Sequence, residues 1–252
     1  MRSCPYFLIV MVVLLACSTG SRESSDANVA EEGFNFEGSD PAAVELADSI
    51  MSAMGGRSNW NRARYISWSF SGRRNLIWDK QSGRVRIESP DDHAMYLINV
   101  NNGQGKVQVN GKEVLDKDSL QRMLNAARSI WINDSYWLVM PFKLKDPGVT
   151  LKYLGEDTLQ TGGKCNVVDL MFTDTGSASE SKYRIYVDIG DNLVKQWSYF
   201  KKADQDSATF TRPWDNYKKY GEVLLSGDRS DGSGPRNVKV DSDLPDKVFT
   251  DF

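Results

Sequence analysis

The stretch 129-SIWINDSYWLVMPFKLKDPGV-149 separates two groups of predicted β-strands and decides how the chain can fold. The residues before it form an amphipathic pattern, which predicts a helix from about Ser119 to Trp131 with Asp118 as its N-cap. After Trp131 the pattern has no clear period, and it contains Pro141 and Pro147. We therefore expect an irregular aromatic segment here, with its backbone hydrogen-bonded by the side chains of Asn133, Asp134 and Ser135.

Patterns of period two lie on both sides of this segment and predict β-strands. Gln81-Ser82-Gly83 and Asn110-Gly111 are hairpin turns between such strands. The expected strands before the segment are 64–72, 75–80, 84–88, 94–100, 106–109 and 112–114. Those after it are 149–153, 165–172, 182–188, 193–200, 207–212 and 219–226.

A first helix is predicted ahead of all these strands. Asp40 is a suitable N-cap, Pro41 suits the first helical position, and Gly55-Gly56 end the pattern. The apolar residues of this helix recur on one face at Val44, Ala47, Met51 and Met54.

The order of these elements predicts a mainly β (α+β) fold. Connections of a few residues favour antiparallel pairing, and about ten or eleven strands in one sheet must curl. We expect one curled antiparallel sheet that forms an unclosed barrel, with the two amphipathic helices covering its concave face like a lid.

The N-terminus has the pattern of a bacterial lipoprotein signal. Arg2 precedes an apolar run from Tyr6 to Ala16, which is too short to cross a membrane, and the run ends in 14-LLAC-17. This resembles a lipobox, which implies cleavage before Cys17 and its acylation with long chains such as palmitate. An ordinary secretory signal followed by a chance cysteine is the alternative.

The domains expected from this are a signal peptide over 1–16, a lipidated cysteine with a flexible tether over 17–39, and a folded domain over 40–252. The mature chain would carry 30 basic and 34 acidic residues, a net charge of −4 without any basic tract, so nucleic acid is not an expected partner. Once Cys4 is removed and Cys17 acylated, Cys165 is left without a disulfide partner and is expected in the core.

Several blocks resemble known bacterial envelope proteins. The hairpin 77-IWDKQSGRVRIE-88 and the strand pair 183-YRIYVDIGDNLVKQW-197 resemble the lipoprotein-carrier superfamily that includes LolA and LolB. The blocks 78-WDK-80, 131-WINDSYWLVMPFKLKD-146 and 214-WDNY-217 are similar to a group of uncharacterised outer-membrane lipoproteins. The resemblance implies an unclosed barrel with an apolar cavity, in a periplasm-facing protein attached to the outer membrane of a Gram-negative bacterium.

The sequence offers little for catalysis or metal binding. His93 is the only histidine, and no G-x-S-x-G, C-x-x-C, P-loop or H-E-x-x-H motif occurs. The cluster 88-ESPDDHAM-95 has metal-ligand side chains, but spacing this tight is also typical of a solvated turn. We therefore expect no catalytic residues, no metal and no cofactor; a hydrolase using His93 or paired carboxylates is a third alternative.

Aromatic side chains are the informative feature. They are either core or the lining of an apolar cavity suited to acyl chains. The candidates for the cavity are Trp68, Phe70, Trp78, Trp131, Tyr136, Trp137, Met140, Phe142 and Trp197. These residues predict a monomeric protein that binds a lipid, lipopeptide or acylated protein without changing it. An envelope module for structure or protein interaction, whose core is filled by its own side chains, is the alternative.

Overall fold

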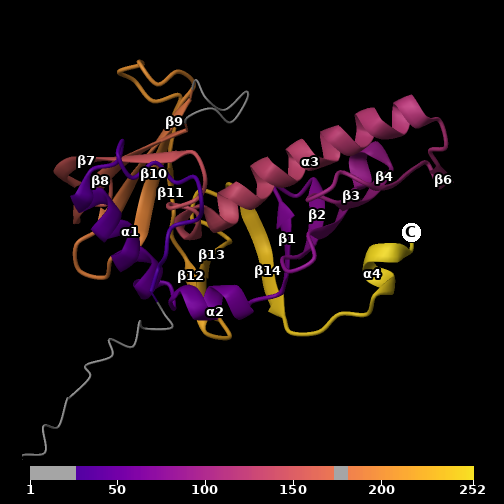
Figure 1. The fold of residues 1–252 in the computed structure, drawn as a ribbon, viewed down its shortest axis with the longest axis horizontal. Helices are drawn as coiled ribbons and strands as arrows, with labels where there is room; N and C mark the ends of the chain where they lie inside the picture. Colours follow the sequence, from indigo (N-terminus) through magenta and orange to yellow (C-terminus); the bar gives the residue numbers. More distant parts are fainter. Residues whose placement is uncertain (1–26, 173–180) are drawn as a thin grey trace, which may run out of the picture.

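The computed structural model describes residues 27–172 and 181–252, and its sheets are antiparallel (Figure 1). The predicted signal peptide and Cys17 lie outside the described residues. The α-helices are α1 (Pro41–Ala53), α2 (Arg57–Arg62), α3 (Lys117–Val139) and α4 (Lys247–Thr250). Short 3-10 turns cover Pro90–Asp92 and Met140–Phe142.

The first sheet has seven strands in the order β14-β1-β2-β3-β4-β5-β6. Its strands are β1 (Tyr65–Phe70), β2 (Arg74–Asp79), β3 (Arg84–Ser89), β4 (Ala94–Asn99), β5 (Gly105–Val109), β6 (Lys112–Glu113) and β14 (Pro235–Asp241). Both predicted hairpins are present, because Asp79 pairs with Arg84 and Val109 pairs with Lys112. At the second turn Asn110 and Gly111 both have positive φ, as a two-residue hairpin requires.

The second sheet has five strands in the order β11-β10-β9-β8-β7, and a separate pair joins β12 to β13. These strands are β7 (Val149–Thr158), β8 (Lys164–Phe172), β9 (Lys182–Asp188), β10 (Val194–Phe200), β11 (Phe210–Pro213), β12 (Tyr217–Tyr220) and β13 (Val223–Ser226). The predicted strand 219–226 is therefore a hairpin, whose turn at Gly221 has a positive φ.

Helix α3 connects the two halves of the molecule. Its N-terminal part lies along β3, β4 and β5, and its C-terminal part reaches β13, β14 and the 3-10 turn after it (Figure 1). Asp116 caps the helix by accepting a hydrogen bond from the backbone N–H of Ser119 at 2.9 Å, so the cap lies two residues before the predicted one. Leu124 and Ala127 are buried at one end, and Leu138 and Val139 at the other.

One continuous apolar core contains residues from both larger sheets, α1 and α3. Trp137 of α3 is partly buried and packs against this core, in edge contact with Phe70 of β1 at 5.9 Å and with Trp197 of β10 at 4.6 Å between ring centroids. The two sheets are thus held together by aromatic packing across the helix.

The mainly antiparallel fold class and its open sheets are confirmed. Among the described residues no sheet closes into a barrel, and the α-helices are few. We expected one sheet, but the strands form three hydrogen-bonded sheets. They are divided because α3 and its aromatic side chains lie between the two larger sheets. No helix in the described ranges combines the length and hydropathy that crossing a membrane requires.

The described part of the predicted tether, residues 27–39, packs on the domain. Phe34 is buried, and the backbone N–H groups of Asn35 and Asp40 donate to the carbonyls of Val149 and Leu151 in β7. The folded unit therefore begins well before residue 40.

Candidate functional site

The segment after Trp131 is helical where an irregular loop was expected. Helix α3 continues to Val139, and only Met140–Phe142 form a 3-10 turn, which contains Pro141. Asp134 is fully buried, and its carboxylate accepts hydrogen bonds from the Arg74 guanidinium at 2.7 and 3.0 Å. This ion pair fixes the helix against β2, so Asp134 serves the tertiary structure and not a loop backbone.

A buried arginine holds the same end of the helix. The guanidinium of Arg229 donates to the carbonyl oxygen of Trp137 at 2.5 Å and to the Ser226 hydroxyl at 3.0 Å. It lies 3.7 Å from the ring centroid of Trp214, and burial lowers its pKa to about 10. A cation at the last turn of a helix stabilises the free carbonyls there.

Five of the nine predicted cavity residues are packed in the core. Their exposed fractions are 7% or less: Trp68, Phe70, Met140, Phe142 and Trp197. Trp137 packs among them, as described above. Most of the space that the aromatic residues could have enclosed is therefore filled by their own side chains.

Tyr136 is the predicted residue that lines an apolar cleft. This cleft, called the apolar cleft below, has a volume of about 450 Å³ and lies beside the C-terminal half of α3. Its lining residues are Ser129, Ile132, Asn133, Tyr136, Lys143, Asp146, Pro147, Val149, Phe172 and Tyr183. Ile132 lies at the rim of this cleft and is 49% exposed.

The tyrosines in the apolar cleft have unusual surroundings. The hydroxyl of Tyr136 is buried and has no hydrogen-bond partner among the described residues. Burial raises the pKa of Tyr136 well above its usual value and raises that of Tyr183 to about 12. Their ring centroids are 5.2 Å apart. Both phenols therefore stay neutral at physiological pH.

Trp78 and Phe142 line a neighbouring cleft, called the basic cleft below. It has a volume of about 360 Å³. Trp131 packs edge-on against Trp78 at 5.4 Å, and neither indole N–H has a partner among the described residues. The two clefts share Lys143, Asp146 and Pro147, so they meet at this segment.

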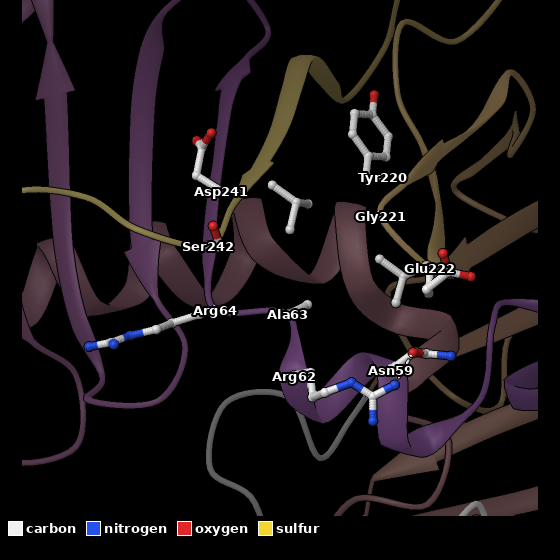
Figure 2. A pocket seen from close by; sticks show the side chains of 11 residues that line it. Asn59, Arg62, Ala63, Arg64, Tyr220, Gly221, Glu222, Asp241 and Ser242 are labelled. Atoms are coloured by element: carbon white, nitrogen blue, oxygen red, sulfur yellow. Dashed lines mark hydrogen bonds between the residues drawn. The ribbon is translucent and has the colours of Figure 1, made fainter.

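A further cleft lies between α2, the β12–β13 turn and the end of β14 (Figure 2). Its volume is about 210 Å³. Arg62 lies against Asn59, whereas Arg64 extends toward the seven-stranded sheet and pairs with Asp79 (Figure 2). Arg62, Arg64 and Glu222 are paired with other side chains of the protein and do not converge on one point.

The residues considered for catalysis are not assembled into a site. His93 is exposed in a tight turn with a φ of 49°, and Cys165 is fully buried, which raises the pKa of its thiol. Within the described ranges no three His, Cys, Asp or Glu side chains gather as metal ligands would. The Ser89 hydroxyl donates to Asp92 at 2.6 Å, which is typical of a solvated turn.

Sequence reasoning missed several residues of the two clefts. Ile132 could have been identified, because it is an apolar residue that follows Trp131 on the exposed side of a helix. Val149, Phe172 and Tyr183 gave no such signal, since their strands meet α3 only in the folded chain.

No protein-family model matches the chain, and no curated protein matches it significantly. Solved structures with a similar fold include a DUF1329 family protein from Desulfovibrio piger, with a TM-score of 0.42 and 11% identity over 82% of this chain and 96% of that one. A putative outer membrane lipoprotein-sorting protein domain from Vibrio parahaemolyticus has a TM-score of 0.41 and 9% identity, with coverage of 82% and 96%. A LolA superfamily protein from Nitrosomonas europaea has a TM-score of 0.33 and 10% identity, with coverage of 81% and 96%. The names agree with the resemblance predicted from the sequence, but similarity this low carries no argument about function.

Proposed function

We propose that the protein binds the acyl chain of an amphiphile in the apolar cleft and does not alter it chemically. The amphiphile is a lipid, a lipopeptide or an acylated protein. One observation carries the proposal: a cleft of about 450 Å³ beside α3 is lined by half-exposed Ile132 and by the aromatic residues Tyr136, Phe172 and Tyr183. Its volume is in the range of small-molecule sites, which are mostly apolar with a few polar groups that orient the ligand.

The driving force would be desolvation of apolar surface. Each Å² removed from water contributes about 25 cal/mol before the cost of ordering the ligand. The aromatic rings of Tyr136, Phe172 and Tyr183 offer a rigid wall, so few protein side chains need to be ordered on binding.

The proposal includes the cellular setting expected from the N-terminus. Acylation of Cys17 would attach the chain to the outer membrane, with the domain facing the periplasm as a monomer. The support is the 14-LLAC-17 pattern after an apolar run. Mass spectrometry of the N-terminal peptide from the native membrane fraction tests this point, and an unmodified Cys17 would contradict it.

The test of binding uses native mass spectrometry and titration with dodecanoate. Ile132→Asp places a charge at the rim of the apolar cleft and should abolish binding. Leu154→Asp is the matched control, because Leu154 is also 49% exposed but lies on β7 outside the lining. Equal binding by both variants would show that the acyl chain lies elsewhere.

A second candidate function is an envelope module for structure or protein interaction. The observation that favours it is the complete burial of Trp197, Met140 and Phe142, which fill the centre of the fold. It predicts no bound lipid after purification and no uptake of dodecanoate. The same titration therefore separates the two functions.

A further inference from the structure

The basic cleft brings three cations together next to the apolar cleft. Its lining includes the stacked rings of Trp60 and Phe142, whose centroids are 4.1 Å apart, and the cations Arg57, Lys80 and Lys143. Glu31 and Asp146 are the carboxylates in the lining. Positive charge therefore exceeds negative charge at this point.

The partners of each cation show which charge is uncompensated. Lys143 pairs with Asp146, and Arg57 donates to the amide oxygen of Asn28 at 3.0 and 2.6 Å. The Lys80 ammonium has no carboxylate partner among the described residues: its Nζ lies 3.5 Å from the carbonyl oxygen of Asn61 and 4.6 Å from the ring centroid of Trp60.

The surroundings of Lys80 disfavour its positive charge. Burial lowers its pKa from 10.5 to about 8, and the positive charges of Arg57 and Lys143 add to this. A half-buried cation beside two like charges costs free energy, which an anion at the same place would offset.

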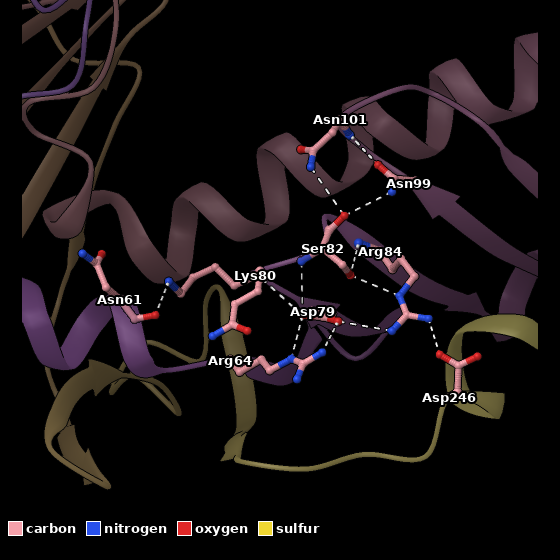
Figure 3. Close-up of polar contacts among 10 residues, drawn as sticks. Asn61, Arg64, Asp79, Lys80, Ser82, Arg84, Asn99, Asn101 and Asp246 are labelled. Atoms are coloured by element: carbon pink, nitrogen blue, oxygen red, sulfur yellow. Dashed lines mark hydrogen bonds and ion pairs between the residues drawn. The ribbon is translucent and has the colours of Figure 1, made fainter.

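The position of Lys80 is fixed by its neighbour in the β2–β3 hairpin. The buried carboxylate of Asp79 accepts hydrogen bonds from Arg64 and Arg84 and from the backbone N–H of Gln81 at 3.2 Å (Figure 3). Figure 3 shows the Lys80 side chain leaving this turn toward Asn61. The bonds of Asp79 thus order the backbone from which Lys80 extends, and the Lys80 ammonium reaches the Asn61 carbonyl oxygen at 3.5 Å.

We propose that Lys80 and the basic cleft hold the anionic group, a phosphate or carboxylate, of the same amphiphile whose chain lies in the apolar cleft. This inference rests on the proposed function, and it names the ligand class as an acidic amphiphile. The shared residues Lys143, Asp146 and Pro147 place the two clefts next to each other, so one molecule can occupy both. An ammonium and a guanidinium at a partly desolvated site form strong charge-assisted hydrogen bonds with such an anion.

Calorimetric titration of the full protein with dodecanoate and with dodecanol tests the proposal, because the two differ only in the charged group. We expect dodecanoate to bind at least about tenfold more tightly. Lys80→Gln should remove most of this preference, and Lys80→Arg should keep it. Lys239→Gln is the matched control, since Lys239 is an exposed lysine on β14 outside the lining of the basic cleft.

The outcomes separate the two proposals. Equal affinity for dodecanoate and dodecanol would overturn the inference while leaving acyl-chain binding in place. An equal loss of preference in Lys80→Gln and Lys239→Gln would also overturn it, because the effect would then be one of overall charge. Absence of binding by either compound would refute the proposed function itself.

The source of the anion is tested with inorganic phosphate alone. The proposal expects weak binding, because a free ion lacks the chain that the apolar cleft holds. Phosphate binding as tight as that of dodecanoate, and unchanged in Ile132→Asp, would overturn the assignment to an amphiphile.

Discussion

Replacement of Trp137 by alanine tests whether the aromatic residues around α3 are core or cavity lining. The indole contacts Phe70, Trp197 and Phe210, with ring centroids 5.9, 4.6 and 5.5 Å away. It therefore joins a strand of each large sheet to the helix between them. If this is core packing, the substitution should lower stability and leave the binding of an acyl chain intact.

The expected magnitude follows from the buried area. An indole buries about 200 Å², which at about 25 cal/mol per Å² gives an upper bound of about 5 kcal/mol. Trp137 is only partly buried, which lowers this value, while the lost edge contacts and the residual cavity raise it. We expect Trp137→Ala to reduce the free energy of unfolding by about 4 kcal/mol.

Urea unfolding followed by far-UV circular dichroism measures the change. Trp137→Phe is the matched variant, because it keeps an aromatic ring between the sheets and should lose less than half as much. Dodecanoate binding by the folded fraction should be within about twofold of the wild type, a small free-energy change, since Trp137 does not line the apolar cleft. A loss of less than about 1 kcal/mol, an ordinary value for a point substitution, would refute the assignment of Trp137 to the core.

Three further predictions concern charged side chains. Asp134→Ala should lower the free energy of unfolding in urea by about 2–4 kcal/mol, because it leaves the partly buried Arg74 unpaired. A double substitution with Arg74→Met should recover part of this free energy, and additive losses would contradict the pairing. Burial favours a raised pKa at Asp79, but hydrogen bonds from Arg64, Ser82 and Arg84 outweigh it and hold the pKa at about 2. The free energy of unfolding should therefore fall as the pH is lowered from about 4 to about 2. Asp79→Asn should show a smaller fall over this range than the wild type. Near pH 8, dodecanoate should bind with uptake of a proton by Lys80, because the anion raises its lowered pKa; the other charged groups that line the basic cleft are Arg57, Lys143, Glu31 and Asp146. Calorimetry in two buffers of different ionisation enthalpy measures the uptake, which should vanish in Lys80→Gln.

The local patterns of the sequence predicted much of the fold. Gln81-Ser82-Gly83 and Asn110-Gly111 specified their hairpins because turn geometry depends on a few adjacent residues. The first helix was predicted at its observed start, with Asp40 as the N-cap residue and Pro41 in the first turn. The Asp40 carboxylate makes no capping hydrogen bond and accepts instead from the backbone N–H of Tyr153. These elements depend on contacts between residues close in the sequence, or on a backbone conformation that only a few residue types adopt.

The larger misses depend on contacts between residues far apart in the sequence. Asn133, Asp134 and Ser135 are poor helix formers. The helix continues through them because Asp134 pairs with Arg74 in β2 and Arg229 holds the Trp137 carbonyl, both of which are contacts with distant parts of the chain. Strand β14 was not predicted, because its partner β1 lies at the other end of the chain.

The candidate site was predictable only in part. The aromatic pattern identified Tyr136 and Trp78, which line the clefts, but it could not separate them from Trp68 or Trp197, which are core. A cleft forms where a side chain has no neighbour, and the absence of a neighbour leaves no pattern in a sequence. The binding role of all these residues stays a prediction.

The packing of residues 35–40 along β7 also bears on how the chain avoids self-association. An open sheet has free edges that can pair with another copy of the same sheet. Here the backbone of Asn35 and Asp40 and the side chains of Ser39 and Asp40 occupy the first half of the β7 edge. At the far edge of the other sheet, β6 is only two residues long and consists of Lys112 and Glu113. A chain shortened to begin at Pro41 would uncover the β7 edge and should aggregate through it, even though every strand of the sheet is still present.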